Sequence, residues 1–147
     1  KKCALFFLVA CAFAMTGCSH NSLYLRSDYV DHDSLASVYA GTPDSLKENP
    51  YVGQRLIANW SLSRAQASKS NLRLQIDIRY GSKEQESFVL PIEGSEGSYV
   101  YKILNDDYFN KKGFLTYRGI ILASDGEVVA EWKHQIWTDV LLLDEEL

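Results

Sequence analysis

Residues 72–80 alternate strictly, with an apolar residue at every even position and a polar residue at every odd position. Successive side chains of a β-strand point to opposite faces, so this pattern predicts a strand with one face on a hydrophobic core and one in water. Half-buried strands are typical of antiparallel sheets, because parallel sheets are usually covered on both faces. We therefore expect the chain to fold around antiparallel sheets.

Further strands are predicted on both sides of this segment. The alternation of Leu56, Ala58, Trp60 and Leu62 indicates an earlier strand, and later ones are expected over residues 87–92 and 98–104. Pro91 should end or bulge its strand, since proline cannot donate to a ladder. Asn105, Asp106 and Asp107 are expected to break the pattern in a turn.

The pair Asp125-Gly126 lies between two apolar runs and predicts a hairpin with a two-residue type I′ turn. Pairing of Ser124 with Glu127 then fixes the register, and Gly119 should leave room for the indole of Trp132. The predicted core face pairs Ala123 with Val128, Ile121 with Ala130, Gly119 with Trp132, Tyr117 with His134, and Leu115 with Ile136. The second face pairs Leu122 with Val129, Ile120 with Glu131, Arg118 with Lys133, and Phe114 with Trp137. Arg118 directly opposite Lys133 is unfavourable, and Glu131 is expected to lie diagonally within reach of Arg118.

Several short antiparallel strands at hairpin spacing predict an all-β fold. We expect an immunoglobulin-like β-sandwich over residues 51–147, with a small β-barrel as the alternative. Residues 18–50 are more polar and contain turn formers, which indicates a partly ordered tether with a short helix over residues 32–40.

The first residues predict export. Lys1 and Lys2 precede an apolar stretch over residues 3–15, which is followed by Thr16-Gly17-Cys18. The stretch of 13 residues is shorter than the roughly 20 needed to cross a bilayer, so a cleaved signal is favoured over a transmembrane helix. Gly17-Cys18 before a polar run resembles the lipobox of bacterial lipoproteins, although Met15 stands where Leu is usual. An ordinary secretory signal is the alternative.

This resemblance implies that residues 1–17 are removed and that Cys18 carries the lipid that holds the protein on a membrane. Ser19 in place of Asp after the cysteine would favour the outer membrane, if enterobacterial sorting rules apply. The segments 41–44 and 53–56 (Gly-Thr-Pro-Asp and Gly-Gln-Arg-Leu) also resemble uncharacterised lipoproteins of chlamydia-like bacteria. That second resemblance implies no known chemistry.

Charge and cysteine content exclude several classes of function. Without Lys1 and Lys2 the chain has 13 basic and 19 acidic residues, a formal net charge of −6, which disfavours nucleic-acid binding. Cys3, Cys11 and Cys18 all lie in the signal or at its end. The folded domain therefore has no disulfide, no cysteine-bound metal and no thiol nucleophile.

Four aromatic residues form the candidate binding face: Phe114 and Trp137 on the second hairpin face, and Tyr99 and Tyr101 on one strand. If these rings are exposed, they suit stacking on a sugar or contact with a partner; if they are covered, they are core.

The remaining polar candidates are expected to be structural. His134 should lie on the core face near Tyr117 and hydrogen-bond to a tyrosine. The segment Asp31-His32-Asp33 and the pair Asp106-Asp107 are interpreted as solvated chain and turn, because neither has the spacing of a metal site. No catalytic residue, metal site or cofactor is predicted.

The sequence thus predicts a lipid-anchored protein of the bacterial cell envelope that works by binding or structural support, with an envelope protein as partner. The alternatives are a carbohydrate-binding module and a subunit of an envelope glycan-processing enzyme. Most carboxylates fall on outward faces rather than in a cleft, which favours the non-enzymatic hypothesis.

Overall fold

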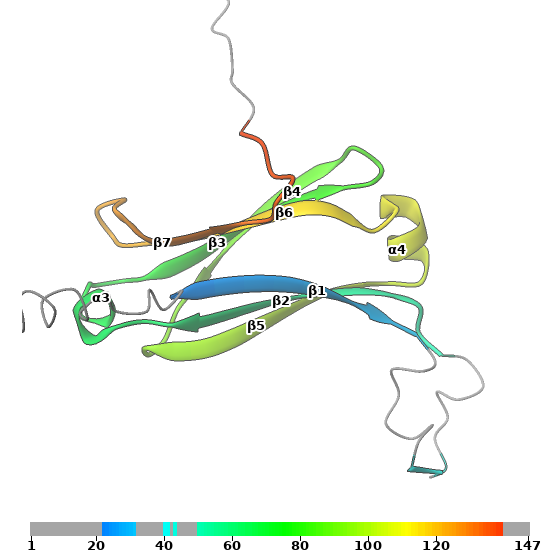
Figure 1. The fold of residues 1–147 in the computed structure, drawn as a ribbon, viewed down its shortest axis with the longest axis horizontal. Coiled ribbons are helices and arrows are strands. Elements are labelled where there is room, and N and C mark those ends of the chain that lie inside the picture. The colour runs from blue at the N-terminus through cyan, green and yellow to red at the C-terminus, as the bar shows by residue number, and fades with distance from the viewer. Residues whose placement is uncertain (1–21, 32–39, 42, 44–49, 140–147) are drawn as a thin grey trace, which may run out of the picture.

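A computed structural model describes residues 22–31, 40–41, 43 and 50–139 of the protein (Figure 1). Seven strands and two short helices make up the described fold. In chain order they are β1 (Leu23–Val30), β2 (Gly53–Ser61), α3 (Arg64–Ala67), β3 (Arg73–Tyr80), β4 (Gln85–Pro91), β5 (Glu96–Leu104), α4 (Asp106–Lys111), β6 (Phe114–Leu122) and β7 (Val128–Lys133).

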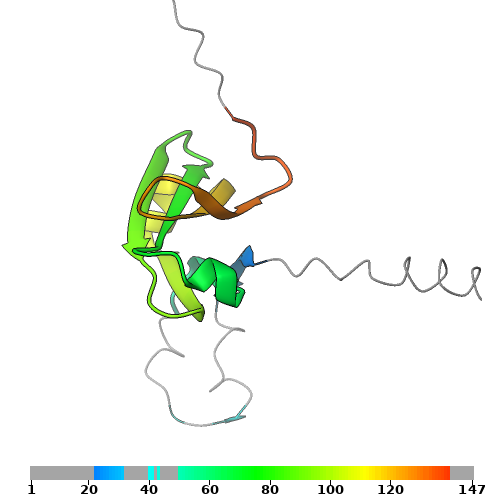
Figure 2. The ribbon, with the colours of Figure 1, turned by 90° about the vertical axis from the view of Figure 1, so that its left-hand side faces the viewer.

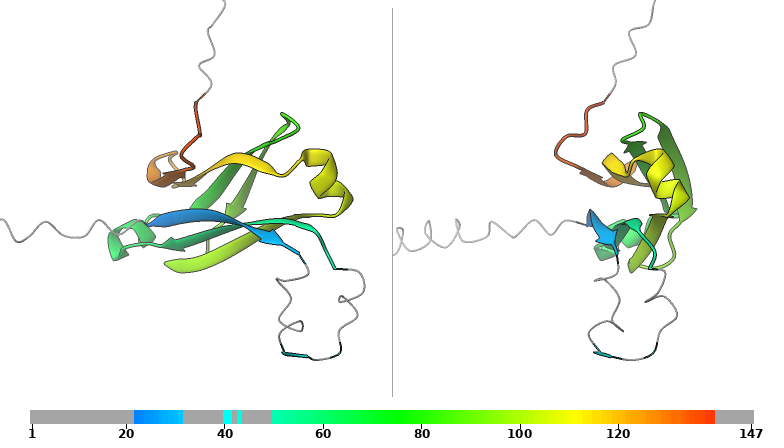
Figure 3. Two further views of the ribbon diagram at one scale, coloured as in Figure 1. Left: turned by 45° about the vertical axis from the view of Figure 1, so that its right-hand side comes forward. Right: turned by 90° about the vertical axis from the view of Figure 1, so that its right-hand side faces the viewer.

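The strands form two antiparallel sheets that pack face to face. One sheet has the order β1-β2-β5 and the other has the order β4-β3-β6-β7. Helices α3 and α4 lie at opposite ends of the two layers (Figure 1), and Figures 2 and 3 show the layers from those ends. The sheets do not close on one another, so the predicted sandwich is confirmed and the barrel alternative is wrong.

The alternating residues of β3 form the centre of the core. Leu74, Ile76, Ile78 and Tyr80 are each no more than 1% exposed. They pack in the same cluster as Leu25, Leu56 and Ile103 of the other sheet. The strand predicted over residues 72–80 is thus present as β3, and its even positions face inward as expected.

Strand β1 lies in the segment that we expected to be part of the tether. It pairs antiparallel with β2 along its whole length, from Leu23 opposite Trp60 to Val30 opposite Gly53. Only Leu23 and Leu25 of the strand are buried, because it is an edge strand with polar residues at most other positions. The interpretation of residues 18–50 as a tether is therefore wrong for β1, and the domain begins earlier than residue 51.

The hairpin formed by β6 and β7 has the predicted register over its central four pairs, from Arg118 opposite Lys133 to Ile121 opposite Ala130. Its turn is different. Gly126 donates to the carbonyl of Ala123 at 3.0 Å and is the turn residue with positive φ, which makes a type I turn with a glycine bulge rather than a type I′ turn. The side chain of Asp125 accepts from the backbone N–H of Glu127 at 3.0 Å, which stabilises this form.

The two predicted pairs farthest from this turn do not form. Strand β7 ends at Lys133, so neither Phe114 nor Leu115 has a partner there. Leu115 is instead the extra residue where the pairing of β6 with β3 shifts, and it is 52% exposed rather than buried. The prediction that it faces the core is wrong, because a bulge turns its side chain away from the sheet interior.

Gly119 has a different neighbour from the predicted one. A Cβ atom at Gly119 would lie 2.6 Å from a methyl carbon of Leu25, and the space is filled by β1 rather than by Trp132. The glycine that accommodates an indole is Gly97, where a Cβ atom would lie 2.3 Å from Trp60. Close approach of the two sheets therefore depends on the missing side chain at Gly119.

The polar segment after β5 begins a helix and is not only a turn. Asp106 and Asp107 occupy the first turn of α4, and Asp107 pairs with Lys111 one turn later at 3.6 Å. Carboxylates at a helix N-terminus interact favourably with the free backbone N–H groups there. Residues 32–39 of the predicted helix and the signal segment with Cys18 lie outside the described residues. None of the described helices is long and apolar enough to cross a membrane.

Replacement of Gly119 by Val is expected to lower the free energy of unfolding by about 2 kcal/mol, because the new side chain collides with Leu25 and separates the sheets. Urea unfolding of the folded domain measures this. Leu115→Val on the same strand is the control and should stay within about 0.5 kcal/mol, since Leu115 is exposed. An unchanged midpoint for Gly119→Val would contradict the packing of β1 on β6.

Candidate functional site

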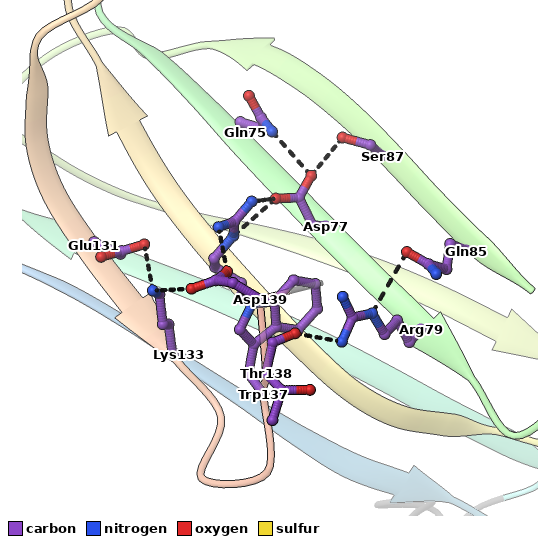
Figure 4. A network of polar contacts seen from close by, with 11 residues as sticks. Gln75, Asp77, Arg79, Gln85, Ser87, Glu131, Lys133, Trp137, Thr138 and Asp139 are labelled. Atoms are coloured by element: carbon purple, nitrogen blue, oxygen red, sulfur yellow. Dashed lines mark hydrogen bonds and ion pairs between the residues drawn. The ribbon is translucent and has the colours of Figure 1, made fainter. Parts of the chain in front are cut away.

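A row of polar side chains crosses the outer face of the four-stranded sheet, with one residue from each strand (Figure 4). Ser87 of β4 lies opposite Asp77 of β3, Asp77 lies opposite Arg118 of β6, and Arg118 lies opposite Lys133 of β7. We call these four residues the outer row. The same alternation that buries the even positions of β3 places Asp77 on this face.

Asp77 is the anchor of the outer row. Its Oδ2 atom accepts from Nε and Nη2 of Arg118 at 3.0 and 2.7 Å, and its Oδ1 atom accepts from Ser87 Oγ at 2.5 Å and Gln75 Nε2 at 2.9 Å. Burial alone would raise the pKa of Asp77, but the hydrogen bonds from Ser87, Gln75 and Arg118 and the charge of Arg118 outweigh it and lower the pKa. The side chain of Asp77 is only 13% exposed, and its carboxylate stays ionised at neutral pH.

Asp139 resolves the repulsion between the two opposed cations of the outer row. Its Oδ1 atom accepts from Arg118 Nη1 at 3.0 Å, and its Oδ2 atom accepts from Lys133 Nζ at 2.9 Å. The expected approach of Glu131 to Arg118 does not occur, since Glu131 pairs with Lys133 at 3.4 Å instead. The hydrogen bonds from Lys133 and then from Trp137 lower the pKa of Asp139.

Residues 134–139, which we call the C-terminal arm, leave the sheet after β7 and cross the outer face. The Trp137 ring lies 4.2 Å from the guanidinium of Arg79 and 5.1 Å from that of Arg118. Arg79 also donates through Nη1 to the carbonyl oxygen of Thr138 at 2.6 Å. Both arginines therefore hold the arm through cation–π contacts and hydrogen bonds.

An open hollow of about 600 Å³ lies beside the arm. Most of its lining residues are charged or polar and come from β3, β4, β6 and the arm, and Ile78 and Trp137 also line it. Its lining residues include Asp77, Arg79, Gln85, Ser87, Trp137 and Asp139. The site is an open surface depression rather than an enclosed cavity.

Trp137 does not join the other three aromatic residues of the predicted binding face. The rings of Tyr99, Tyr101 and Phe114 are partly buried against the core, with Phe114 and Tyr101 6.2 Å apart between ring centres. Trp137 lies instead on the outer face, because the chain leaves the sheet before reaching a position opposite Phe114. The predicted pairing of Phe114 with Trp137 is wrong, and no continuous platform forms from the four rings.

A second polar cluster lies at the α4 end of the sandwich. Glu86 Oε2 accepts from Tyr80 Oη at 2.5 Å, from Tyr101 Oη at 3.1 Å and from Lys111 Nζ at 3.0 Å. Burial and then the hydrogen bond to Glu86 raise the pKa of Tyr80. The hydrogen bond from Tyr80 lowers the pKa of Glu86 against an opposing effect of burial.

Lys111 completes this second cluster as a permanent cation. Burial alone would lower the pKa of Lys111, but the hydrogen bonds to Glu86 and Tyr101 outweigh it and raise the pKa. The phenol therefore stays neutral, the carboxylate anionic and the lysine cationic at neutral pH. A carboxylate that acts as a general base needs a raised pKa, and a phenol or amine that acts as a nucleophile needs a lowered one. The shifts in this cluster run the other way, so its hydrogen bonds serve to attach α4 to both sheets.

His134 packs against the ring of Tyr117 with ring centres 5.0 Å apart, but the predicted hydrogen bond between a tyrosine and His134 is not present among the described contacts. The hydroxyl of Tyr117 donates to Ser27 Oγ at 3.3 Å instead. Nδ1 of His134 is buried without a hydrogen-bond partner. His134 thus contributes ring packing at the base of the arm.

Within the described residues, no group of three or more histidine, cysteine, aspartate or glutamate side chains is arranged to hold a metal ion. Asp106 and Asp107 belong to α4, and of the segment Asp31-His32-Asp33 only Asp31 lies in the described chain.

The chain matches no family model, no curated protein and no solved structure.

Replacement of Asp77 by Asn is expected to lower the free energy of unfolding by about 2 kcal/mol at neutral pH, because Arg118 loses a charged partner. The pKa of Asp77 is lower in the folded state, so its stabilisation is present above the unfolded value of about 3.9 and is lost as the pH falls below it. Urea unfolding of both proteins at about pH 7 and about pH 3 tests this.

The difference between the Asp77→Asn variant and the unsubstituted protein should shrink at the lower pH. Glu93→Gln, at an exposed carboxylate between β4 and β5, is the control and should change stability by less than about 0.5 kcal/mol at either pH. A pH-independent effect of Asp77→Asn would show that the ionised carboxylate is not the stabilising group.

Proposed function

We propose that the protein is a lipid-anchored component of the bacterial cell envelope and acts as a non-enzymatic binding or structural module. Lipid on Cys18 attaches it to a membrane, with the outer membrane as the proposed location. Its partner is another envelope protein, bound through the outer face of the four-stranded sheet.

The observation that carries this proposal is the outer row with its adjoining hollow. A sheet face with no binding role needs only scattered solvated side chains, whereas here charged groups from three strands converge on the arm beside a depression of about 600 Å³. Tryptophan and arginine are enriched among the residues that dominate binding at protein interfaces, and Trp137 lies here between Arg79 and Arg118. We therefore place binding at this face.

The charge states of the two polar clusters support a non-enzymatic role. Asp77 and Glu86 have lowered pKa values, and each has cationic or hydroxyl donors on its oxygens. General acid–base catalysis is most effective with a pKa near the working pH. Carboxylates that remain ionised and paired stabilise structure or bind a partner instead.

The position of the first described residue is compatible with a membrane anchor. Ser22 lies at the α3 end, where its carbonyl oxygen accepts from the N–H of Ser61 at 3.0 Å. β1 starts five residues after Cys18, a stretch that spans at most about 18 Å when fully extended. A lipid on Cys18 would therefore hold the α3 end of the domain close to the bilayer.

The carbohydrate-binding alternative depends on a set of exposed aromatic rings, and the fold does not present one. It needs exposed rings in one plane, but Tyr99, Tyr101 and Phe114 are packed partly inside the sandwich. Trp137 is the one member of the proposed face that lies over the outer sheet surface, and two guanidinium groups lie near its ring.

Replacement of Cys18 by Ala is expected to move the protein from the membrane fraction to the soluble fraction, because the lipid acceptor is lost. Fractionation of cells followed by immunoblotting measures this. Cys11→Ala, within the signal segment, is the matched control and should leave the protein on the membrane. Membrane association that survives Cys18→Ala would refute the lipid anchor.

Isolation of the lipidated protein from its own envelope in mild detergent tests the binding role. We expect one protein in stoichiometric amount, whose recovery falls at least about tenfold with Arg79→Gln, since that change removes a charged contact of the outer face. Lys102→Gln on the other sheet is the control and should leave recovery unchanged. Enrichment of glycan without protein would contradict the proposed partner and favour the carbohydrate-binding alternative.

A further inference from the structure

The C-terminal arm is attached to the sheet almost entirely by side chains. Its last backbone hydrogen bond to a strand in the described chain is from His134 N–H to the carbonyl of Tyr117 at 3.0 Å. Beyond it, the arm is held by the Trp137 ring, the Thr138 carbonyl and the Asp139 carboxylate (Figure 4). Exposed ion pairs contribute only about 0–1 kcal/mol each, so this attachment can exchange for a similar one from another chain.

The donors around Asp139 form a carboxylate site. Arg118, Lys133 and the indole Nε1 of Trp137 all donate to its two oxygens, at 3.0, 2.9 and 3.0 Å. The side chain of Asp139 is 55% exposed, so an incoming carboxylate can reach Arg118 and Lys133, the two donors that belong to the sheet, from solvent.

Displacement of Asp139 would not leave unpaired cations behind. Arg118 would keep Asp77 at 2.7 Å, and Lys133 would keep Glu131 at 3.4 Å. The carboxylate of Asp139 is therefore not needed to neutralise Arg118 and Lys133. Both side chains can still donate hydrogen bonds to another carboxylate when Asp139 has left.

Arg79 adds a cation that has no carboxylate partner among the described residues. Its two hydrogen bonds go to neutral oxygens, the carbonyl of Thr138 at 2.6 Å and the side-chain amide of Gln85 at 3.4 Å. It lines the hollow beside the arm. If a peptide replaced the arm, the guanidinium of Arg79 could donate to a carbonyl oxygen of that peptide and pair with a second acidic side chain.

Building on the proposed function, we propose that the arm occupies the protein's own binding site and that the ligand is an acidic peptide segment of the partner. The segment resembles the arm itself, with an aromatic residue two positions before an aspartate or glutamate. Its carboxylate replaces Asp139 at Arg118 and Lys133, and its aromatic ring replaces Trp137 over Arg79.

The test uses a peptide with the sequence of residues 136–139, acetylated and amidated, added to the full-length protein and to its Asp139→Asn variant. Loss of the internal competitor should tighten peptide binding at least about tenfold in the variant, as expected when a larger fraction of the protein is in the competent state. Isothermal titration calorimetry measures the affinity. The indole N–H resonance of Trp137, which donates to Asp139, should shift on binding.

Two controls assign the binding to the carboxylate site. The peptide with Asn in place of its terminal Asp should bind at least about fivefold more weakly, because it lacks the charge that Arg118 and Lys133 recognise. Lys133→Gln added to the Asp139→Asn variant should weaken binding of the acidic peptide, whereas Lys102→Gln should not. Equal melting temperatures of the variants show that the sandwich is intact.

Equal or absent binding to the unsubstituted protein and the Asp139→Asn variant would overturn the proposal, and so would equal binding of the Asp and Asn peptides. These results are separable from the proposed function. If an envelope protein is isolated through Arg79 but the peptide does not bind, the module binds a partner by another chemistry and only the role of the arm is wrong.

Discussion

Burial of the even-numbered side chains of β3 is the constraint on which the rest of the structure depends. Leu74, Ile76 and Ile78 are fixed between the sheets, so the intervening residues have only one face left to occupy. A shift of one residue along the neighbouring strand would place charged side chains in the core. The position of Asp77 opposite Arg118, and with it the outer row, is therefore a consequence of core packing.

The outer face shows how a like-charge contact inside a sheet is neutralised by carboxylates on both sides of it. Arg118 and Lys133 are directly opposed on neighbouring strands, an arrangement that is unfavourable alone. The buried carboxylate of Asp77 neutralises Arg118 from one side, and the exposed carboxylate of Asp139 bridges both cations from the other. Asp77 belongs to a strand of the sheet, whereas Asp139 belongs to the arm, which is held by side chains. The carboxylate of Asp139 should therefore leave Arg118 more readily than that of Asp77.

The parts of the fold that follow from local pattern were predictable from the sequence, and those set by tertiary contacts were not. The alternation over residues 72–80 and the central register of the β6–β7 hairpin were correct. Strand β1 was missed because only Leu23 and Leu25 are buried in it, so it lacks a clear alternation. The site was missed because it needs Trp137 and Asp139 to leave the strand and fold back, whereas the register alone already indicated that Arg118 and Lys133 require a carboxylate.

Gln66 of α3 links Ser22, the residue before β1, to β7 of the other sheet. Its side chain accepts from Ser22 Oγ at 3.0 Å and donates to the carbonyl of Val129 in β7 at 3.1 Å, while it also caps α3. If lipid on Cys18 anchors the protein and a partner binds the sheet face, as proposed, Gln66 lies on the path of the force between the two. Tension on the tether would be shared between β2, through Ser61, and β7, through Gln66, before β1 could be peeled away. Under that proposal, the contacts of Ser22 and Gln66 would protect an edge strand that has few buried side chains of its own.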